Sequence, residues 1–545
     1  MNTNAFMRGT KVMLTAGLLV GGVLFADAAR CAETISLHPA STMVRVGGTD
    51  GIMPPAALAY KLEMVRNERE GFQLAVLPMD CATIAVHAVS IEFPTDAPPA
   101  KLFRVLAVNH VAPPTNGMFV IPPRNLGLIP DVLMPLDGRS QDALAASVKP
   151  GEVPLTYYVE FVSRLDTKPG DYACKIVIKT DTGTSTLAVS VTVADVTLPA
   201  RFPFRSATCW NWSLQDYYGR ALQPAEKEIF WKFCLEQRLN PCSFFDKKPD
   251  PAPADLAGLQ GEGLSLVCLM QVSGRKPRLL SDKDKEKYGP LLKQWREELT
   301  KQHLENDAVV LLTDEPVDGT AEVCRQNAAW FKAQFPELKI WCATRPGAPW
   351  DEFGDVFDTV TAHSTELYAR HSHDAAALAA FRAKKPFPNG EYWWFHSVEP
   401  YAPYTNVRLD NRPIEARVAG WQSAQAKVDG YEYFWITDWS ENIGAKDVAW
   451  PERSVKWKTG SSGAGTLCYP GENMRPMPSL RLVNLRDGLE DWALVELLSP
   501  RASRTNEPAC LADVTKSLVD YTTNPGAVAE ARGKLIEQLK TTAKK

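Results

Sequence analysis

The chain of 545 residues lacks the sequence motifs of several common enzyme classes. It has no phosphate-binding loop, no dinucleotide fingerprint, no Gly-x-Ser-x-Gly elbow and no His-Glu-x-x-His pair. Its eleven cysteines show no Cys-x-x-Cys and no Cys/His ligand spacing, which argues against a structural zinc site. We therefore expect no metal and no cofactor. Most cysteines lie in apolar runs and are expected to be small buried side chains, although an odd number leaves any disulfide pairing open.

The chain also lacks an excess of charge of either sign. Sixty Lys and Arg residues against 64 Asp and Glu residues give a net charge of −4 and a pI near 6.1. This balance argues against general binding to nucleic acid or to an anionic membrane. With 45% apolar and 23% charged residues, the composition is typical of a soluble globular protein, and the length predicts more than one domain.

Long hydrophobic runs are missing except at the N-terminus. Arg8 and Lys11 precede an apolar run from 12 to 26, which is short and glycine-rich for a membrane span. Small residues at positions −3 and −1 then favour cleavage near Ala28. We interpret residues 1–28 as a signal peptide of an exported protein, periplasmic or secreted, with no membrane span after cleavage. An uncleaved anchor is the alternative, and the arginine before Cys31 disfavours a lipoprotein.

Tryptophan is absent from the first 200 residues, whereas all fifteen tryptophans lie between Trp210 and Trp492. This distribution divides the chain near residue 200. Residues 34–198 contain short strands of alternating polarity separated by turn signals, which predicts a β-sandwich accessory domain.

From 204 to 440, apolar runs alternate with amphipathic stretches of helical length, which predicts a (β/α)₈ catalytic barrel. An open α/β sheet with the same alternation is the alternative. Residues 441–545 are expected to form a loop-rich and helical C-terminal extension packed on the barrel. The eight strands are expected to start near Phe204, Pro241, Leu264, Ala308, Leu338, Asp358, Gly390 and Gly430. The clearest helix candidates are Ala225–Arg238, Lys285–His303, Ala321–Phe335, Asp374–Lys384 and Ile414–Val428.

Asp314 and Glu315 directly follow the fourth apolar run, where the reactive groups of a barrel gather. Neighbouring residues of a strand point to opposite sides, so both can face the barrel mouth only if the strand breaks there, and Pro316 favours such a break. An acid that caps the next helix is the alternative reading. Other strand ends are aromatic or polar, such as those around His363 and Trp435, and aromatic faces beside acids suggest carbohydrate, although any one tryptophan is more often a core residue than a sugar contact.

Several motifs of the chain resemble glycoside hydrolase family 123 and its catalytic-domain relatives. In the first domain they are Val65-Arg66-Asn67-Glu68-Arg69-Glu70-Gly71-Phe72-Gln73, Pro130-Asp131-Val132-Leu133 and Lys168-Pro169-Gly170-Asp171-Tyr172. In the second part they are Thr313-Asp314-Glu315-Pro316, Ile414-Glu415-Ala416-Arg417, Ser479-Leu480-Arg481-Leu482 and the run from Leu485 to Trp492. We interpret Arg417 and the segment 486–491 as structural contacts more readily than as substrate contacts.

The resemblance implies a retaining exo-β-N-acetylgalactosaminidase in which the 2-acetamido group of the substrate attacks C1. Glu315 would then act as general acid and base, while a charged Asp314 orients the acetamido N–H and raises the pKa of Glu315. The alternatives are a hydrolase of another β-glycoside, in which Asp438 could supply a second carboxylate, and a carbohydrate-binding protein without turnover. The oligomeric state stays open. The expected substrate-binding residues are Trp435, Trp439, Tyr392, Trp394, Asn406, Asp438 and His363.

Overall fold

The computed structural model describes most of the chain from residue 35 to 542. The described ranges are 35–49, 51–79, 83–111, 126–136, 146–148, 153–242, 256–344, 356–365, 367, 390–439, 443, 448, 453–455, 462–500 and 507–542. The predicted signal peptide and the helix expected at 374–384 lie outside these residues. Within the described ranges, no helix is long and apolar enough to cross a membrane.

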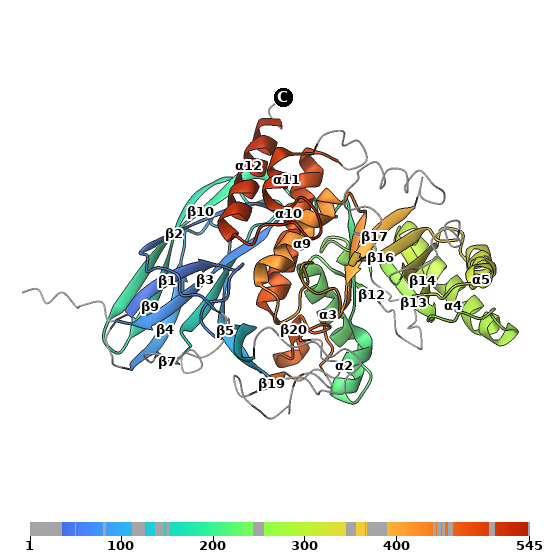
Figure 1. The fold of residues 1–545 in the computed structure, drawn as a ribbon, viewed down its shortest axis with the longest axis horizontal. Coiled ribbons are helices and arrows are strands. Elements are labelled where there is room, and N and C mark those ends of the chain that lie inside the picture. The colour runs from blue at the N-terminus through green and yellow to red at the C-terminus, as the bar shows by residue number, and fades with distance from the viewer. Residues whose placement is uncertain are drawn as a thin grey trace, which may run out of the picture.

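Two sheets form the N-terminal domain, at one end of the molecule (Figure 1). The first has the order β1 (Ile35–Ser41), β3 (Arg69–Pro78), β8 (Leu155–Val162), β5 (Ala100–His110) and β19 (Ser454–Val455), with β6 (Gly127–Pro135) also paired to β5. The second has the order β2 (Ala59–Arg66), β10 (Thr184–Thr197), β9 (Gly170–Thr180), β4 (Ile84–Glu92) and β7 (Ala146–Val148).

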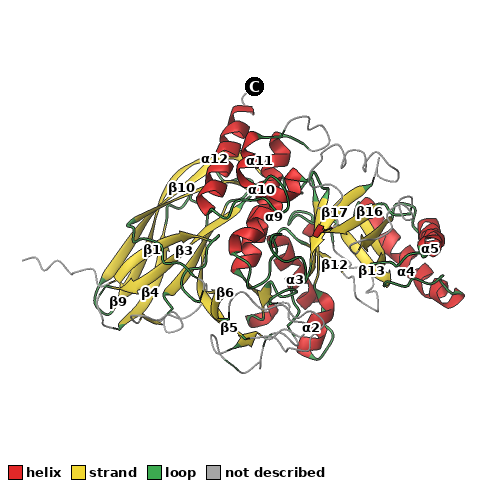
Figure 2. Ribbon diagram, viewed as in Figure 1, coloured by secondary structure: helices red, strands yellow, loops and turns green. Residues whose placement is uncertain are grey.

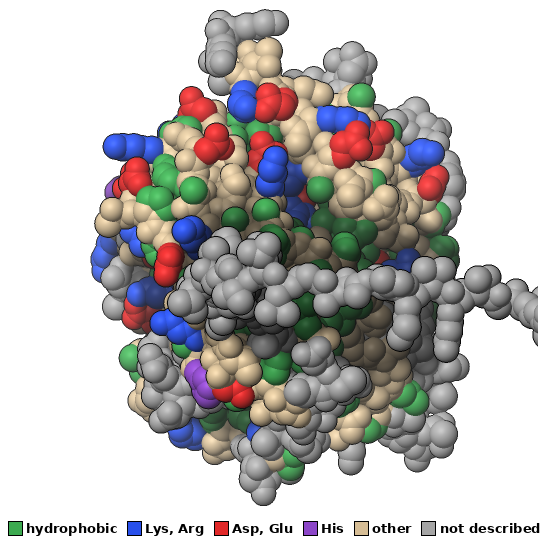
Figure 3. Space-filling model, turned by 90° about the vertical axis from the view of Figure 1, so that its left-hand side faces the viewer, with side chains coloured by type: hydrophobic (Ala, Val, Ile, Leu, Met, Phe, Trp, Pro, Cys, Tyr) green, Lys and Arg blue, Asp and Glu red, His purple; other side chains and the backbone are tan. Residues whose placement is uncertain are grey.

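Side chains from both sheets meet in one apolar core, which makes the domain a sandwich. Strand β3 contributes Phe72, Leu74 and Val76 to this core, and β9 contributes Ile176 and Ile178. Each set alternates with residues of the opposite face, as the period of two in the sequence predicts. On the described surface of this end of the molecule, acidic and basic side chains are interspersed (Figure 3).

Eight parallel strands close into a barrel, which confirms the predicted fold class. Each strand begins within three residues of the expected position. The strands are β11 (Arg205–Cys209), β12 (Asn240–Cys242), β13 (Val267–Ser273), β14 (Ala308–Asp314), β15 (Lys339–Thr344), β16 (Thr359–His363), β17 (Glu391–His396) and β18 (Gly430–Trp435). Figure 2 shows the strands of both domains with helices around and between them.

Helices follow the barrel strands and begin with recognisable caps. Helix α4 starts after Ser281, whose hydroxyl accepts a hydrogen bond from the backbone of Asp284, and α3 and α9 carry proline at their first position. The described helices of the barrel are α2 (Asn211–Tyr218), α3 (Pro224–Glu236), α4 (Asp282–Lys301), α5 (Ala321–Gln334) and α9 (Pro413–Gln425). Single 3₁₀ turns span Ala257–Leu259, Glu305–Asp307 and Glu472–Met474.

The C-terminal extension contains the short strands β20 (Cys468–Tyr469) and β21 (Met477–Pro478) and the helices α10 (Leu480–Leu498), α11 (Ala509–Val514) and α12 (Pro525–Thr542). Helix α10 contacts both α9 of the barrel and β6 of the sandwich, and it lies between the two domains (Figure 1). On one side, Leu480 and Val483 share an apolar cluster with Phe103 and Tyr158 of the sandwich.

On its other side, α10 touches α9 backbone to backbone. A Cβ atom on Gly420 of α9 would lie 1.8 Å from the carbonyl oxygen of Gly488, and one on Gly488 would lie 2.3 Å from that of Arg417. Both positions therefore require glycine. This close approach brings the acidic side chains of α10 within reach of Arg417.

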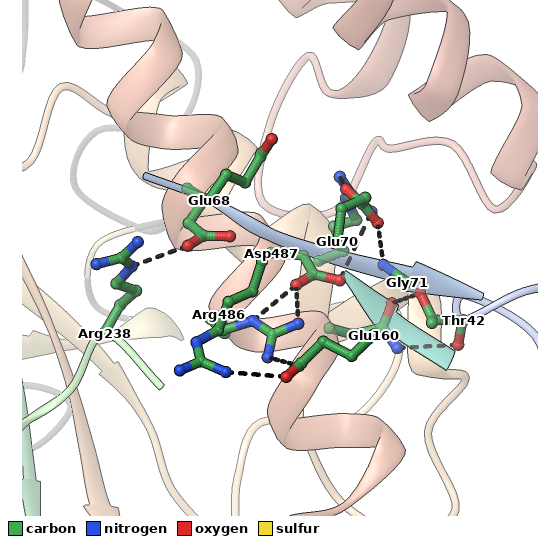
Figure 4. A network of polar contacts seen from close by, with 12 residues as sticks. Thr42, Glu68, Glu70, Gly71, Glu160, Arg238, Arg486 and Asp487 are labelled. Carbon is green, nitrogen blue, oxygen red and sulfur yellow. Dashed lines mark hydrogen bonds and ion pairs between the residues drawn. The ribbon is translucent and has the colours of Figure 1, made fainter. Parts of the chain in front are cut away.

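Ten charged residues, nine of them buried and Arg238 partly buried, form a network where the sandwich, the barrel and the tail meet, and Figure 4 shows part of it. Arg417 donates to Asp491 and to Glu70, each at 2.8 Å, and Arg532 of α12 donates to Asp491 at 3.0 Å. Around Arg486, the side chains of Glu160 and Asp487 accept hydrogen bonds. We call this set the interdomain network: Glu68, Glu70, Glu160, Arg238, Arg417, Arg486, Asp487, Glu490, Asp491 and Arg532.

The interdomain network has six carboxyl groups and four guanidinium groups, and Arg69 adds a fifth cation at its edge, 2.9 Å from Glu160, so acid still exceeds base by one group. Burial raises the pKa of Glu68 to about 7, against the opposing effect of Arg532, and burial also raises the pKa of Asp487 and Glu490. For Glu160, burial acts in the same direction, but Arg486 and Arg69 overcome it and hold the pKa at about 2. The network therefore retains protons near neutral pH.

We expect Arg417→Met to lower the free energy of unfolding by about 3 to 5 kcal/mol, because it leaves Glu70 and Asp491 buried without their shared cation. The measurement is the midpoint of urea unfolding. Arg66→Met is the matched control, since its ion pair with Asp195 is exposed and pairs of this kind contribute about 1 kcal/mol or less. Equal shifts for the two variants would contradict the structural role of the network.

Candidate active site

A bulge in strand β14 turns Asp314 toward the barrel interior. Leu311 pairs with Trp341 and Asp314 pairs with Ala343. Between these two pairs, β14 has one residue more than β15, which defines the bulge. Leu311, Trp341 and Ala343 all belong to the apolar cluster inside the barrel. Partners in register share a face of the sheet, so Asp314 faces the interior as Ala343 does.

Glu315 ends the strand in a left-handed conformation, with φ of +50°. Its backbone N–H still donates to the carbonyl oxygen of Ala343, at 2.8 Å. A non-glycine residue in this region is uncommon and is typical of functional sites. The bulge and the left-handed residue together interrupt the alternation of the strand, so two consecutive carboxyl groups lie near each other at the barrel mouth.

The carboxylate of Glu315 forms an ion pair with the guanidinium of Arg275. Arg275 lies in the loop after β13, and its side chain is 67% exposed, whereas that of Glu315 is 23% exposed. This loop is fixed to β14, because the Thr313 hydroxyl donates to the Gly274 carbonyl at 2.9 Å and the Val317 N–H donates to the Arg275 carbonyl at 3.0 Å. The pair is thus held at the solvent-exposed edge of the site.

Asp314, in contrast, is the acid whose proton affinity is raised. Burial, and next the negative charge of Glu315, raise the pKa of Asp314 to about 7, against the opposing effect of Arg275. The resemblance implies a charged Asp314 beside a protonated Glu315. The structure differs, because burial and the neighbouring Glu315 favour the protonated form of Asp314, while the Glu315 side chain is paired with Arg275.

A third carboxyl group, that of Glu432, shares the barrel interior. It lies on β18 in register with Ala207 and Phe395, and it is 4% exposed. Burial and the neighbouring Asp314 raise the pKa of Glu432 to about 8, while a hydrogen bond with Thr361 acts in the opposite direction. Burial therefore favours the protonated form of Glu432 near neutral pH.

Two of the expected substrate-binding residues also lie on the interior side. Trp435 pairs with Cys209 after a second bulge, in β18, and packs against the interior cluster while half-buried. His363, at the end of β16, pairs with Phe395, and the two rings meet edge to face at 5.2 Å. The Nδ1 atom of His363 is 2.7 Å from the Thr365 hydroxyl. These rings share the interior with Asp314 and Glu432.

Tyr392 and Trp394 do not line the site, and that expectation needs correction. Trp393 of the same strand points into the barrel, so its two neighbours point outward into the core beneath the helices. Trp394 is fully buried and donates from Nε1 to the Ser423 hydroxyl on α9 at 2.9 Å.

Trp439 and Asn406 are likewise core residues rather than contacts for a sugar. Trp439 is 1% exposed, meets Tyr217 edge to face at 5.3 Å and donates from Nε1 to the Cys468 carbonyl at 2.8 Å. Asn406 is fully buried and holds its own loop by donating to the carbonyls of Ser397 and Pro400 at 3.2 and 3.1 Å.

Asp438 lies just beyond β18 and is partly buried. Its backbone N–H donates to the Gly465 carbonyl at 2.8 Å, and its backbone carbonyl accepts from the Thr466 hydroxyl at 2.8 Å. These two contacts tie it to the loop before β20.

Glu432 and Arg275 were missed from the sequence. Glu432 lies alone among aromatic residues within a strand, so no acidic neighbour or motif in the sequence marks it. Arg275 does follow a strand, but exposed arginines are common, and nothing in the chain predicts its contact with Glu315. Among the described residues, no group of three or more His, Cys, Asp or Glu side chains could hold a metal ion, and the nine described cysteines are buried free thiols.

Residues 270–498 match the sequence model described as glycoside hydrolase 123, catalytic domain. The chain is a glycoside hydrolase. The match over residues 270–498 confirms the resemblance to family 123 that the motifs showed.

Solved structures agree with this assignment at the level of the fold. A family 123 glycoside hydrolase from Clostridium perfringens superimposes with a TM-score of 0.65 over 94% of this chain and 99% of that chain, at 12% identity. Two β-glucuronidases, from an uncultured Clostridium sp. and from Dictyoglomus thermophilum, have TM-scores of only 0.33 at 12% and 9% identity, over 78% of this chain and 67% of theirs. No curated protein sequence matches the chain.

The raised pKa values predict how two variants change stability with pH. A carboxyl group whose pKa is raised by folding binds its proton more tightly in the folded state, so its contribution to stability is lost as pH rises through the folded pKa. Since Asp314 has a pKa of about 7 and Glu432 of about 8, stability should fall between about pH 4 and 8.

We expect Asp314→Asn and Glu432→Gln to unfold at a higher urea concentration than the wild type at pH 9, and to differ little from it at pH 5. Each pKa unit corresponds to about 1.4 kcal/mol, so the gain at pH 9 has an upper limit of about 4 to 5 kcal/mol. Urea midpoints at the two pH values measure it. A gain of the same size at pH 5 would show that burial of the charged form is not the cause.

Proposed function

We propose that the protein is an exported, retaining exo-β-N-acetylgalactosaminidase that uses the 2-acetamido group of its substrate as nucleophile. Glu315 protonates the departing oxygen and then activates water. Asp314 accepts a hydrogen bond from the acetamido N–H and stabilises the positive charge of the oxazolinium intermediate. The carbohydrate substrate binds at the barrel mouth, where Trp435 offers an aromatic face.

The observation that carries this proposal is the placement of two consecutive carboxyl groups at one mouth. In a retaining enzyme with a protein nucleophile, two carboxyl groups about 5 Å apart flank the sugar, and one of them attacks as a carboxylate. Glu432 is the third acid inside the barrel, but it is buried and protonated, which makes it a poor nucleophile. An internal nucleophile on the substrate removes the need for one.

Separate observations bear on the sugar and on export. The solved Clostridium perfringens relative is described by its hydrolysis of a glycolipid glycan, which favours a glycan as the substrate class here too. Export rests on the apolar N-terminal segment, and N-terminal sequencing of the secreted protein should begin just after Ala28.

A panel of aryl β-glycosides tests class and sugar together. We expect turnover of the β-N-acetylgalactosaminide, and a loss of at least about 100-fold in kcat/KM for Glu315→Gln on substrates with poor leaving groups. Asp314→Asn should lower kcat by a similar factor with its fold intact, because it no longer stabilises the oxazolinium. Turnover confined to a glycoside without a 2-acetamido group would identify a different hydrolase, and binding without turnover would favour a lectin-like protein.

A thiazoline analogue of the intermediate separates the two retaining mechanisms. We expect competitive inhibition by the thiazoline and no covalent labelling by a 2-deoxy-2-fluoro sugar. Labelling of a carboxyl group, found by mass spectrometry, together with no thiazoline inhibition would exclude the substrate-assisted reaction.

The two acids also predict the shape of the pH profile. In the productive form of the pair, the single proton is on Glu315; in the other singly protonated form, it is on Asp314. Both forms are lost when the pair releases this proton. Because that proton has a pKa of about 7, kcat/KM should fall about tenfold per pH unit above pH 7. A profile that stays level to pH 9 would show that this proton is not needed.

A further inference from the structure

The loop after β13 carries an unusual concentration of positive charge next to the general acid. Its sequence, Gly274-Arg275-Lys276-Pro277-Arg278, has three cations in five residues. The first three residues are exposed, whereas Pro277 is buried. We call residues 274–278 the basic loop.

Hydrogen bonds hold the basic loop in place at both ends. At its start, the Gly274 and Arg275 carbonyls accept from Thr313 and Val317, at 2.9 and 3.0 Å. At its end, the Nδ2 atom of Asn327 donates to the Arg278 carbonyl at 2.9 Å, and Asn327 is 3% exposed. The cations are therefore presented on a fixed backbone, which reduces the conformational entropy lost when a ligand binds.

The charges of the basic loop are only partly neutralised. Arg278 pairs with Asp284 at 2.8 Å, and Arg275 pairs with Glu315. Among the described residues, Lys276 has no acidic partner within ion-pair distance. The Arg275 side of the Arg275–Glu315 pair is largely exposed, and pairs open to solvent contribute little to stability, so Arg275 can exchange partners readily.

This ion pair opposes the chemistry proposed for Glu315. A general acid must carry a proton, but a guanidinium stabilises the carboxylate form. The charged groups that face Glu315 are Arg275 from the basic loop, Asp314 from β14 and Glu432 from β18. An anion that took Arg275 away would allow one proton to pass from Asp314 to Glu315, with no net gain or loss of protons.

We propose that the substrate carries an anionic group, a carboxylate or a sulfate ester, on the leaving-group side of the scissile bond, and that Arg275 exchanges Glu315 for this anion. The inference rests on the proposed function, because it assigns Glu315 as the general acid. Glu315 must reach the departing oxygen, so a guanidinium that touches its carboxylate lies beside the leaving group. Lys276 supplies a second positive charge to the same anion.

Three aryl β-N-acetylgalactosaminides with leaving groups of equal acidity test this proposal, with a neutral, a carboxylated and a sulfated aglycone. We expect wild-type kcat/KM to be about tenfold higher for at least one anionic aglycone than for the neutral one, as one added ion pair with a charged donor allows. Whether the carboxylate or the sulfate ester gains more identifies the source of the charge. The preference should weaken as salt is added.

Arg275→Gln should remove the anion preference, and Lys276→Gln should reduce it. Arg278→Gln is the matched control: it deletes one positive charge from the same loop, but that charge is already held by Asp284, so the preference should persist. Arg275→Lys should retain part of it, because the charge remains while the planar fork is lost.

A pH profile distinguishes the release of Glu315 from simple binding of the anion. On the neutral substrate, Arg275→Gln should move the alkaline limb of kcat/KM up by roughly one pH unit, because the cation no longer stabilises the ionised pair. Arg278→Gln should leave the limb in place. A loop residue with only a structural role would not move it.

Equal kcat/KM for all three aglycones in the wild type would overturn the proposal, and so would an anion preference that survives Arg275→Gln or an alkaline limb that does not move in that variant. These outcomes leave the proposed function intact as long as the neutral N-acetylgalactosaminide is hydrolysed and Glu315→Gln is inactive on poor leaving groups. If Glu315→Gln is fully active, the proposed function fails first.

Discussion

The arrangement of the two domains depends on keeping ten charged side chains paired while they are out of water. A buried charge without a partner costs several kcal/mol, so any other placement of α10 against the sandwich and α9 would be penalised. Arg417 illustrates this constraint, because it binds both Glu70 of β3 and Asp491 of α10. Both pairs form only when the sandwich and α10 are correctly placed around α9. The glycine contact between α9 and α10 makes this reach possible.

The same helix also shapes the barrel mouth. Arg481, in the first turn of α10, binds Asp131 of the sandwich and donates to the carbonyls of Val407, Gly463 and Thr466 at 2.7 to 3.0 Å. The last two carbonyls belong to the loop that contacts the backbone of Asp438. Tyr469 also donates to Asp131, at 2.6 Å, so this aspartate of the sandwich is connected to the loops beyond β18 through two side chains.

The period of the apolar runs was enough to predict the sandwich and the eight strands of the barrel, because burial on both faces leaves a strong signal. Alternation within a strand was predictable too, and counting from Trp393 would have placed Tyr392 and Trp394 outside the barrel. The bulges in β14 and β18 could not be predicted, since an extra residue leaves no mark in composition or period. They decide which way Asp314 and Trp435 point. Contacts between segments far apart in sequence, such as Arg275 with Glu315, depend on the closed barrel and have no local signal.

Acidic residues outnumber basic ones both in the interdomain network and in the barrel mouth, and burial raises carboxyl pKa values in both places. The consequences differ because of solvent access. In the network, all six carboxyl groups are buried, so the protons that they bind stabilise one arrangement of the domains. At the mouth, Glu315 and Arg275 are accessible to water, so Arg275 can change partners and the Glu315 carboxylate can accept the proton of Asp314. A site that must move a proton between neighbouring acids needs that asymmetry: one carboxyl deep enough to hold the proton, and one exposed enough to exchange its counter-ion for the substrate.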